Sequence, residues 1–155
     1  MERYTSIRPI LALSTVMKWK IHQMDVKTTL LNGIVEKEVY IEYPLGFEIY
    51  DMQTHVCKLK KDLYGLKQAP RTWYGRINSF LMSPGFTKSK VDSNLYFKVE
   101  GSTPVLVLLY VDDLFLIGEE KLIIDSKRRL VTQFELKYLC LTHCFLGMDV
   151  WKSAY

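Results

Sequence analysis

Two apolar arms flank a pair of adjacent carboxylates in the run Val105-Leu106-Val107-Leu108-Leu109-Tyr110-Val111-Asp112-Asp113-Leu114-Phe115-Leu116-Ile117. Both arms are too apolar for surface strands, which predicts a buried antiparallel hairpin formed by residues 105–110 and 113–117. Two ionised carboxylates side by side repel each other and are costly to bury unpaired, so a divalent cation is their natural compensation. Taken alone, the same pair is also typical of an ordinary polar hairpin turn.

The sequence around this hairpin predicts a mixture of helices and strands. A helix capped by Thr5 and Ser6 is expected to run to about Lys20, with Pro9 in its first turn. A second begins at Pro70 and stops before Pro84. Further strands are expected at 20–26, 39–43, 56–59, 95–99 and 145–150, with a third helix at 120–134. Because the order is not a strict βαβ alternation, we predict an α+β fold, an antiparallel sheet packed against helices.

A third carboxylate follows another apolar strand. Asp25 stands near the C-terminal end of the predicted strand 20–26. If that strand joins the sheet of the hairpin, Asp25, Asp112 and Asp113 converge at one sheet edge. Carboxylates gathered in this way form the oxygen-rich site that a pair of Mg²⁺ ions prefers.

Composition bounds the class of protein. The 155 residues are 48% hydrophobic and 13% aromatic, which suffices for one packed domain over 1–155 and argues against disorder. A net charge of +4 permits nucleic acid as a partner without requiring it. The longest apolar stretch is shorter than the ~18 residues of a membrane span, so no membrane partner is expected. Free thiols and an intracellular location follow from the odd cysteine count, with cytoplasmic particle and nucleus both open.

Several blocks of sequence occur in a specific order along nearly the whole chain. They include His22-Gln23-Met24-Asp25-Val26-Lys27-Thr28, Leu31-Asn32-Gly33, Leu63-Tyr64-Gly65-Leu66-Lys67-Gln68-Ala69-Pro70, Tyr110-Val111-Asp112-Asp113 and Phe145-Leu146-Gly147. In this order the blocks resemble the reverse transcriptase of Ty1/copia-type retrotransposons.

The resemblance implies a polymerase palm with part of the fingers. In such a palm Asp25, Asp112 and Asp113 are catalytic and hold two Mg²⁺ ions, for which Mn²⁺ can substitute, and the carbonyl of Val26 is a further metal ligand. The implied activity is RNA-directed DNA polymerisation. Its partners are an RNA or DNA template with primer, deoxynucleoside triphosphates and the remaining segments of a polyprotein.

Further binding residues follow from the same resemblance. The nucleotide contacts would be Leu30, Tyr64, Gly65 and Lys67. The nucleic-acid contacts would be Lys58, Lys60, Lys61, Arg71 and Tyr110. For the basic residues, an ordinary solvated face is the alternative interpretation.

The chain also departs from the family pattern. Leu30 stands where an aromatic residue is usual, and Cys140 and Cys144 replace a usual glycine and tyrosine. The basic part of the fingers, the thumb and ribonuclease H are expected to be missing. We therefore expect a fragment that is inactive alone. A catalytically dead nucleic-acid-binding remnant and a purely structural one are the alternatives.

Overall fold

A computed structural model describes residues 4–33, 37–44, 46–47, 55–83, 85–141, 144–145 and 148–149. The chain separates into two compact units. The first unit consists of residues 1–27 and 80–155, and the second unit of residues 28–79.

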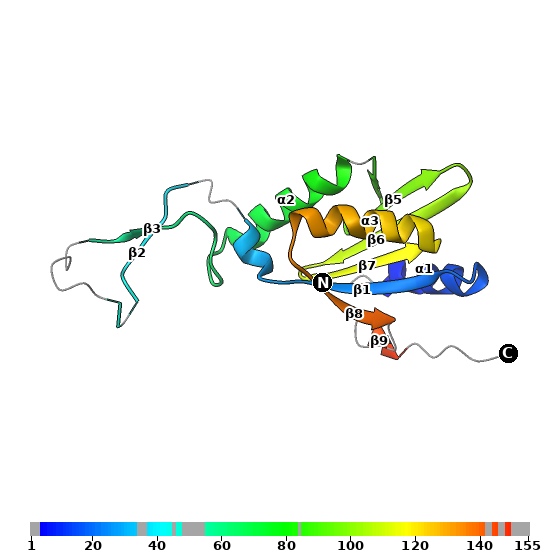
Figure 1. The fold of residues 1–155 in the computed structure, drawn as a ribbon, viewed down its shortest axis with the longest axis horizontal. Helices are drawn as coiled ribbons and strands as arrows, with labels where there is room; N and C mark the ends of the chain where they lie inside the picture. The colour runs from blue at the N-terminus through cyan, green and yellow to red at the C-terminus, as the bar shows by residue number, and fades with distance from the viewer. Residues whose placement is uncertain are drawn as a thin grey trace. The chain divides into compact units, whose positions relative to one another are not determined.

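A six-stranded antiparallel sheet organises the first unit (Figure 1). Its strands lie in the order β4 (Thr87–Lys88), β5 (Leu95–Glu100), β6 (Thr103–Tyr110), β7 (Asp113–Gly118), β1 (Lys20–Val26) and β8 (Leu136–Leu141). The apolar hairpin predicted at 105–117 forms the two central strands, β6 and β7. With three α-helices among the described residues, the predicted α+β class with an antiparallel sheet is confirmed.

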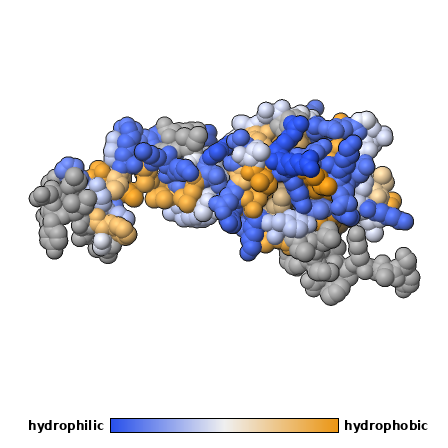
Figure 2. Space-filling view, in the orientation of Figure 1, coloured by the Kyte–Doolittle hydropathy of each residue, from blue (hydrophilic) through white to orange (hydrophobic). Residues whose placement is uncertain are grey.

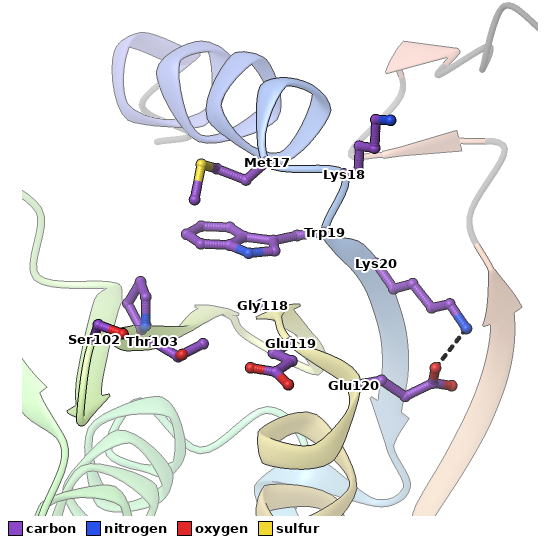
Figure 3. Close-up of a pocket in the computed structure, with 10 residues that line it drawn as sticks. Met17, Lys18, Trp19, Lys20, Ser102, Thr103, Gly118, Glu119 and Glu120 are labelled. Atoms are coloured by element: carbon purple, nitrogen blue, oxygen red, sulfur yellow. Dashed lines mark hydrogen bonds and ion pairs between the residues drawn. The ribbon is translucent and has the colours of Figure 1, made fainter.

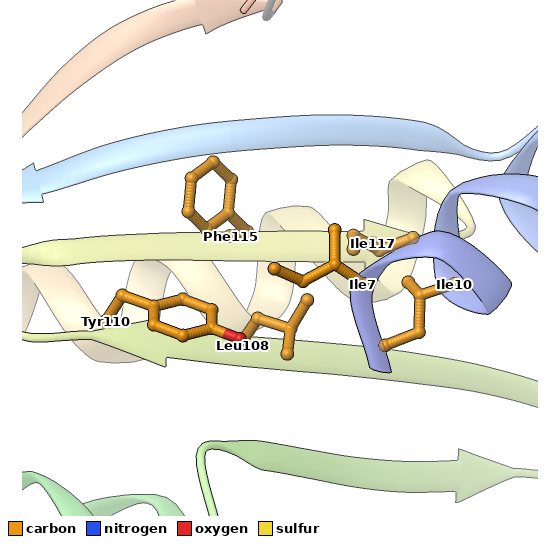
Figure 4. Packing of buried hydrophobic residues seen from close by; sticks show 6 residues of the cluster. All are labelled: Ile7, Ile10, Leu108, Tyr110, Phe115 and Ile117. Carbon is orange, nitrogen blue, oxygen red and sulfur yellow. The ribbon is translucent and has the colours of Figure 1, made fainter. Parts of the chain in front are cut away.

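Helices cover both faces of this sheet. On one face, Ile7 and Ile10 of α1 (Tyr4–Val16) pack against β6 and β7 (Figure 4). The strand residues of this cluster are Leu108, Tyr110, Phe115 and Ile117. On the other face, Val107 of β6 and Leu130 of α3 (Glu120–Gln133) line the same small cavity. The sheet is therefore buried on both sides, as the apolar arms predicted.

The end of α1 differs from the prediction. The helix stops at Val16 instead of continuing to about Lys20, and Pro9 lies in its second turn because the helix begins at Tyr4. Lys18 adopts a left-handed conformation with φ of 55°. This reversal lets the Trp19 N–H donate to the Ser14 carbonyl at 2.9 Å and the Lys18 N–H to the Thr15 carbonyl at 3.2 Å. That pair of bonds is the Schellman arrangement, which closes a helix.

Replacing Lys18 by glycine should stabilise the first unit. A side chain makes the left-handed conformation costly by about 1–2 kcal/mol, whereas glycine adopts it freely. Part of this gain is offset by the greater freedom of glycine in the unfolded chain, so we expect a net gain of about 0.5–1 kcal/mol. Urea denaturation of both proteins measures it. A loss of stability in Lys18→Gly would contradict the helix end described above.

The second unit contains shorter elements. They are the 3-10 helix η1 (Thr29–Asn32), the strands β2 (Tyr40–Ile41) and β3 (Cys57–Lys58), and most of α2 (Ala69–Met82). β2 and β3 form the antiparallel hairpin predicted at 39–43 and 56–59, but they are shorter. In this unit Ala69, Trp73 and Ile77 of α2 are buried at the four-residue spacing of a helical face.

A buried carboxylate ties the second unit together. Asp62 is fully buried and accepts hydrogen bonds from the side chains of Gln68, at 3.2 Å, and Thr72. Its backbone N–H donates to the carbonyl of Gly33 at 3.3 Å. The segment after η1 is thereby joined to the start of α2.

Two further differences concern the C-terminal part. The predicted strand 145–150 consists of two short paired strands, β9 (Cys144–Phe145) and β10 (Met148–Asp149), and β8 was not predicted. The expected helix stop at Pro84 lies outside the described residues. None of the described helices is long and apolar enough to cross a bilayer. Figure 2 shows hydrophilic side chains interspersed with hydrophobic ones on the viewed surface of the first unit.

Candidate functional site

The strand register places the three predicted carboxylates, Asp25, Asp112 and Asp113, at one end of the central strands. Asp25 near the end of β1 lies directly opposite Asp113, the first residue of β7. Asp112 occupies the two-residue turn between β6 and β7, and its carbonyl accepts the Val26 N–H at 2.8 Å. We call these three residues the carboxylate site; all of them belong to the first unit.

The turn that carries the site is tight. Tyr110 and Asp113 are paired across it, so Val111 and Asp112 must reverse the chain. Val111 does so with φ of 48°, which is rare for a β-branched residue. Such backbone strain persists only where the surrounding structure imposes it. Here the buried strands β6 and β7 hold both ends of the turn and fix the position of the aspartates.

Negative charge accumulates at this site. Asp113 is half-buried, and this burial raises the pKa of its carboxyl above the ordinary value. A hydrogen bond from Gln23 acts in the opposite direction on that pKa, while the charges of Asp112 and Asp25 raise it further. The site therefore holds carboxylates whose mutual repulsion a cation would relieve.

The residues present fit a hard divalent cation by their chemistry. Carboxylate oxygens and the carbonyl of Val26 are the ligand types that Mg²⁺ prefers. Within the part of the chain that the structure describes, no three His, Cys, Asp or Glu side chains are already gathered as a metal site. The carboxylate site therefore offers the right types of metal ligand, but its side chains are not gathered around a single point.

The remaining predicted residues fall into two groups. Tyr110 lies opposite Asp113, but its side chain is buried in the cluster that packs against α1. The others belong to the second unit, where all except the half-buried Leu30 are exposed: Lys58, Lys60, Lys61, Tyr64, Gly65, Lys67 and Arg71. Among them, Lys58 is paired with Glu38. Gly65 has φ of 95°, which is typical of glycine in a turn.

Gln23 is a residue of this site that sequence analysis missed. Its side-chain Nε2 donates to Asp113 Oδ1 at 2.9 Å. The signal for it was available, because residues two apart on a strand share one face and Gln23 stands two positions before Asp25.

A second polar cluster lies on the other face of β1. The Nδ1 atom of His22 is 2.8 Å from Lys127 Nζ and 3.0 Å from the Tyr138 hydroxyl. The Lys127 ammonium also lies 3.9 Å from the centre of the Tyr138 ring. Because Lys127 donates to it, Nδ1 acts as an acceptor, so the imidazole carries its hydrogen on Nε2 and is neutral.

This cluster predicts a loss of stability in mild acid. Burial lowers the pKa of His22 below its ordinary value of 6.5, and the positive charge of Lys127 lowers it further. Below pH 6.5 the imidazole of His22 therefore takes up a proton in the unfolded chain but not in the folded chain. As the pH decreases, the free energy of unfolding decreases too. His22→Gln should flatten this part of the profile. Thermal unfolding between pH 7.5 and 5.5 measures the difference; the same acid loss in both proteins would contradict the prediction.

Comparison with known proteins identifies a family that matches the chain. The family described as reverse transcriptase (RNA-dependent DNA polymerase) matches residues 1–155. Over 153 residues the chain is 43% identical to the retrovirus-related Pol polyprotein from transposon TNT 1-94 of Nicotiana tabacum, covering 97% of this chain and 12% of that protein.

Two further relatives are similar to the chain. The retrovirus-related Pol polyprotein from transposon RE1 of Arabidopsis thaliana is 38% identical over 146 residues, which is 94% of this chain and 10% of that protein. A putative transposon Ty5-1 protein of Saccharomyces cerevisiae is 33% identical over 132 residues, which is 84% of this chain and 43% of that protein. The chain thus spans less than half the length of each of these relatives. No solved structure matches it.

Proposed function

The chain belongs to the reverse transcriptase (RNA-dependent DNA polymerase) family, in the form found in copia-type Pol polyproteins, and from this premise we propose that the carboxylate site is a polymerase active centre. The proposed reaction is RNA-directed transfer of nucleotides to a primer. The observation that carries it is the strand register that sets Asp25 opposite Asp113.

In this proposal Asp25, Asp112 and Asp113, with the Val26 carbonyl, hold two Mg²⁺ ions, or Mn²⁺ as a substitute. When bound, such ions activate the primer 3′-hydroxyl and stabilise the leaving pyrophosphate. The chain itself concentrates carboxylate charge at the end of a rigid sheet. The apolar packing of β6 and β7 keeps the turn with Asp112 in place, which limits the reorganisation needed when charge develops.

The first unit would then act as a palm, and the second unit would supply part of the fingers. Nucleotide contacts are assigned to Leu30, Tyr64, Gly65 and Lys67. Support for nucleic-acid contacts of Lys60, Lys61 and Arg71 comes from their exposure, since phosphate binding requires accessible cations. Lys58 and Tyr110 remain in the proposal with less support, because Lys58 is already paired with Glu38 and Tyr110 is buried.

The proposed partners are an RNA or DNA template with primer, deoxynucleoside triphosphates and other segments of a polyprotein, inside the cell. Relatives of the chain are much longer than it is. We therefore propose that these 155 residues hold the metal ions but extend a primer poorly without contributions from other segments. Two alternatives are a catalytically dead nucleic-acid-binding remnant and a structural one.

Binding of a labelled primer–template to the purified chain, with and without Mg²⁺ and over a range of salt concentrations, separates these functions. Asp112→Asn is the test variant and Asp125→Asn, on the exposed side of α3, is its control. Binding that Mg²⁺ strengthens only when Asp112 is intact supports the active centre. Salt-dependent binding that is the same with and without Mg²⁺, and the same in wild type and Asp112→Asn, identifies a nucleic-acid-binding remnant. Absence of binding identifies a structural one.

A parallel primer-extension assay tests the proposed weakness of the isolated chain. Efficient extension that disappears in Asp112→Asn would contradict that weakness while supporting the active centre. Extension that persists in Asp112→Asn would contradict the active centre itself.

A further inference from the structure

The two consecutive aspartates of the carboxylate site are restrained differently. Asp113 is the first residue of β7, is half-buried and accepts the Gln23 amide. Asp112 is exposed in the turn, and within the described residues its side chain has no hydrogen bond or ion pair. One carboxylate is thus tethered to the sheet and the other is not.

The tether follows from the register of β1 and β7. Gln23 pairs with Phe115 and Asp25 pairs with Asp113, so Gln23 stands diagonally across from Asp113 on the same face. Diagonal neighbours in an antiparallel pair are within reach of a long side chain. Gln23 Nε2 accordingly donates a hydrogen bond to Asp113 Oδ1 at 2.9 Å. The other carboxylate oxygen of Asp113, Oδ2, takes no part in this bond.

An amide suits this position for an electrostatic reason. It supplies a hydrogen-bond donor to a half-buried carboxylate, which would otherwise lose part of its solvation without replacement. A lysine or arginine here would also donate, but its positive charge would compete with a metal ion for the same carboxylates. Glutamine satisfies Asp113 and leaves the negative charge of the site intact.

We propose that Gln23 is a positioning residue of the carboxylate site: it holds Asp113 against β1 through Oδ1, so that Oδ2 of Asp113 can engage a divalent ion together with Asp25 and Asp112. This inference rests on the proposed function. Gln23 acts through Asp113 and does not itself contact the ion or the substrate.

The test is the affinity of the full chain for Mn²⁺, measured by electron paramagnetic resonance of the free ion. Gln23→Met removes the hydrogen-bond donor at nearly constant side-chain length. If the Gln23→Met protein does not fold, Gln23→Leu is the second test variant. Gln133→Met, at the exposed end of α3, is the matched control. We expect Mn²⁺ affinity to fall about tenfold in Gln23→Met, as for other residues that orient a metal ligand, and to stay unchanged in the control.

A double-mutant cycle separates positioning from general stability. If Gln23 acts through Asp113, Gln23→Met should have no further effect on Mn²⁺ affinity in an Asp113→Ala background. An equal loss in both backgrounds, or wild-type affinity in Gln23→Met, would overturn the positioning role alone. A wild-type chain that binds no Mn²⁺ would instead overturn the proposed function, and the positioning role with it.

Discussion

Gly33→Ala is expected to lower the free energy of unfolding by at least about 3 kcal/mol. A Cβ atom at this position would lie 2.6 Å from Asp62 Oδ2 and 2.6 Å from Thr72 Oγ1, which is too close for any real contact. The backbone of Gly33 has φ of −65°, so alanine meets no conformational obstacle there. The cost is therefore steric: the methyl group must displace a buried carboxylate from its hydrogen bonds.

Gly75 offers a matched control in the same unit. It lies in α2, is exposed, and a Cβ there would meet no atom within 4 Å. Gly75→Ala should therefore stabilise the protein by about 0.5–1 kcal/mol through helix propensity. Urea denaturation followed by far-ultraviolet circular dichroism compares the two variants. Equal stability of Gly33→Ala and wild type would show that Asp62 and Thr72 do not pack against Gly33 as described.

Asp112→Asn should affect metal binding and stability in opposite directions. Loss of a charged ligand should weaken Mn²⁺ binding by at least about a hundredfold, since residues that merely support a ligand already contribute ten- to a hundredfold. The same change removes a negative charge beside Asp113, whose pKa is raised by burial and by its carboxylate neighbours. The metal-free variant should therefore melt at a higher temperature than wild type.

Asp125→Asn controls for the loss of one carboxylate elsewhere in the first unit. Asp125 is exposed on α3, 3.9 Å from Arg128, and stands outside the carboxylate site. This control should keep wild-type Mn²⁺ affinity. Calorimetry and Mn²⁺ titration of both variants give the comparison. An Asp112→Asn protein that binds Mn²⁺ like the control would contradict the assignment of Asp112 as a ligand. A metal-free Asp112→Asn protein that is less stable than wild type would contradict the repulsion between Asp112 and Asp113.

Local patterns were sufficient to predict the main elements. The apolarity of the arms at 105–110 and 113–117 predicted β6 and β7, and Pro70 and Pro84 marked the limits within which α2 was predicted. The apolar signal is strong because burial acts on every residue of the element at once. The α+β class followed from the order of the elements.

Features that depend on distant residues were not predicted. β8 pairs with β1 across more than a hundred residues, and Asp62 is held by Thr72 of α2 and by the Gly33 carbonyl next to η1. The end of α1 depends on a left-handed Lys18, a conformation for which sequence patterns favour glycine. The pairing of β8 thus lies outside any local window of sequence, whereas the end of α1 is local but uses a backbone conformation that its sequence disfavours.

The carboxylate site was predicted in part from local sequence and in part became visible only in the structure. Adjacent Asp112 and Asp113 after an apolar arm, with Asp25 at the end of another apolar strand, predicted a metal site on the condition that the two strands share one sheet. The register of β1 against β7 then supplied the spatial relation that sequence could not. Gln23 became visible only with that register, although its spacing from Asp25 already placed both on one face.

Iron-directed cleavage of the backbone tests the location of the metal ions most directly. Fe²⁺ replaces Mg²⁺ in oxygen-rich sites, and with ascorbate and peroxide it cuts nearby peptide bonds, which mass spectrometry locates. Bound at the carboxylate site, Fe²⁺ should cut next to Asp25 and within 111–113, and excess Mg²⁺ or Asp112→Asn should suppress both cuts. Cuts confined to other segments, or cuts at these positions that neither Mg²⁺ nor Asp112→Asn suppresses, would contradict a metal-binding polymerase centre at Asp25, Asp112 and Asp113.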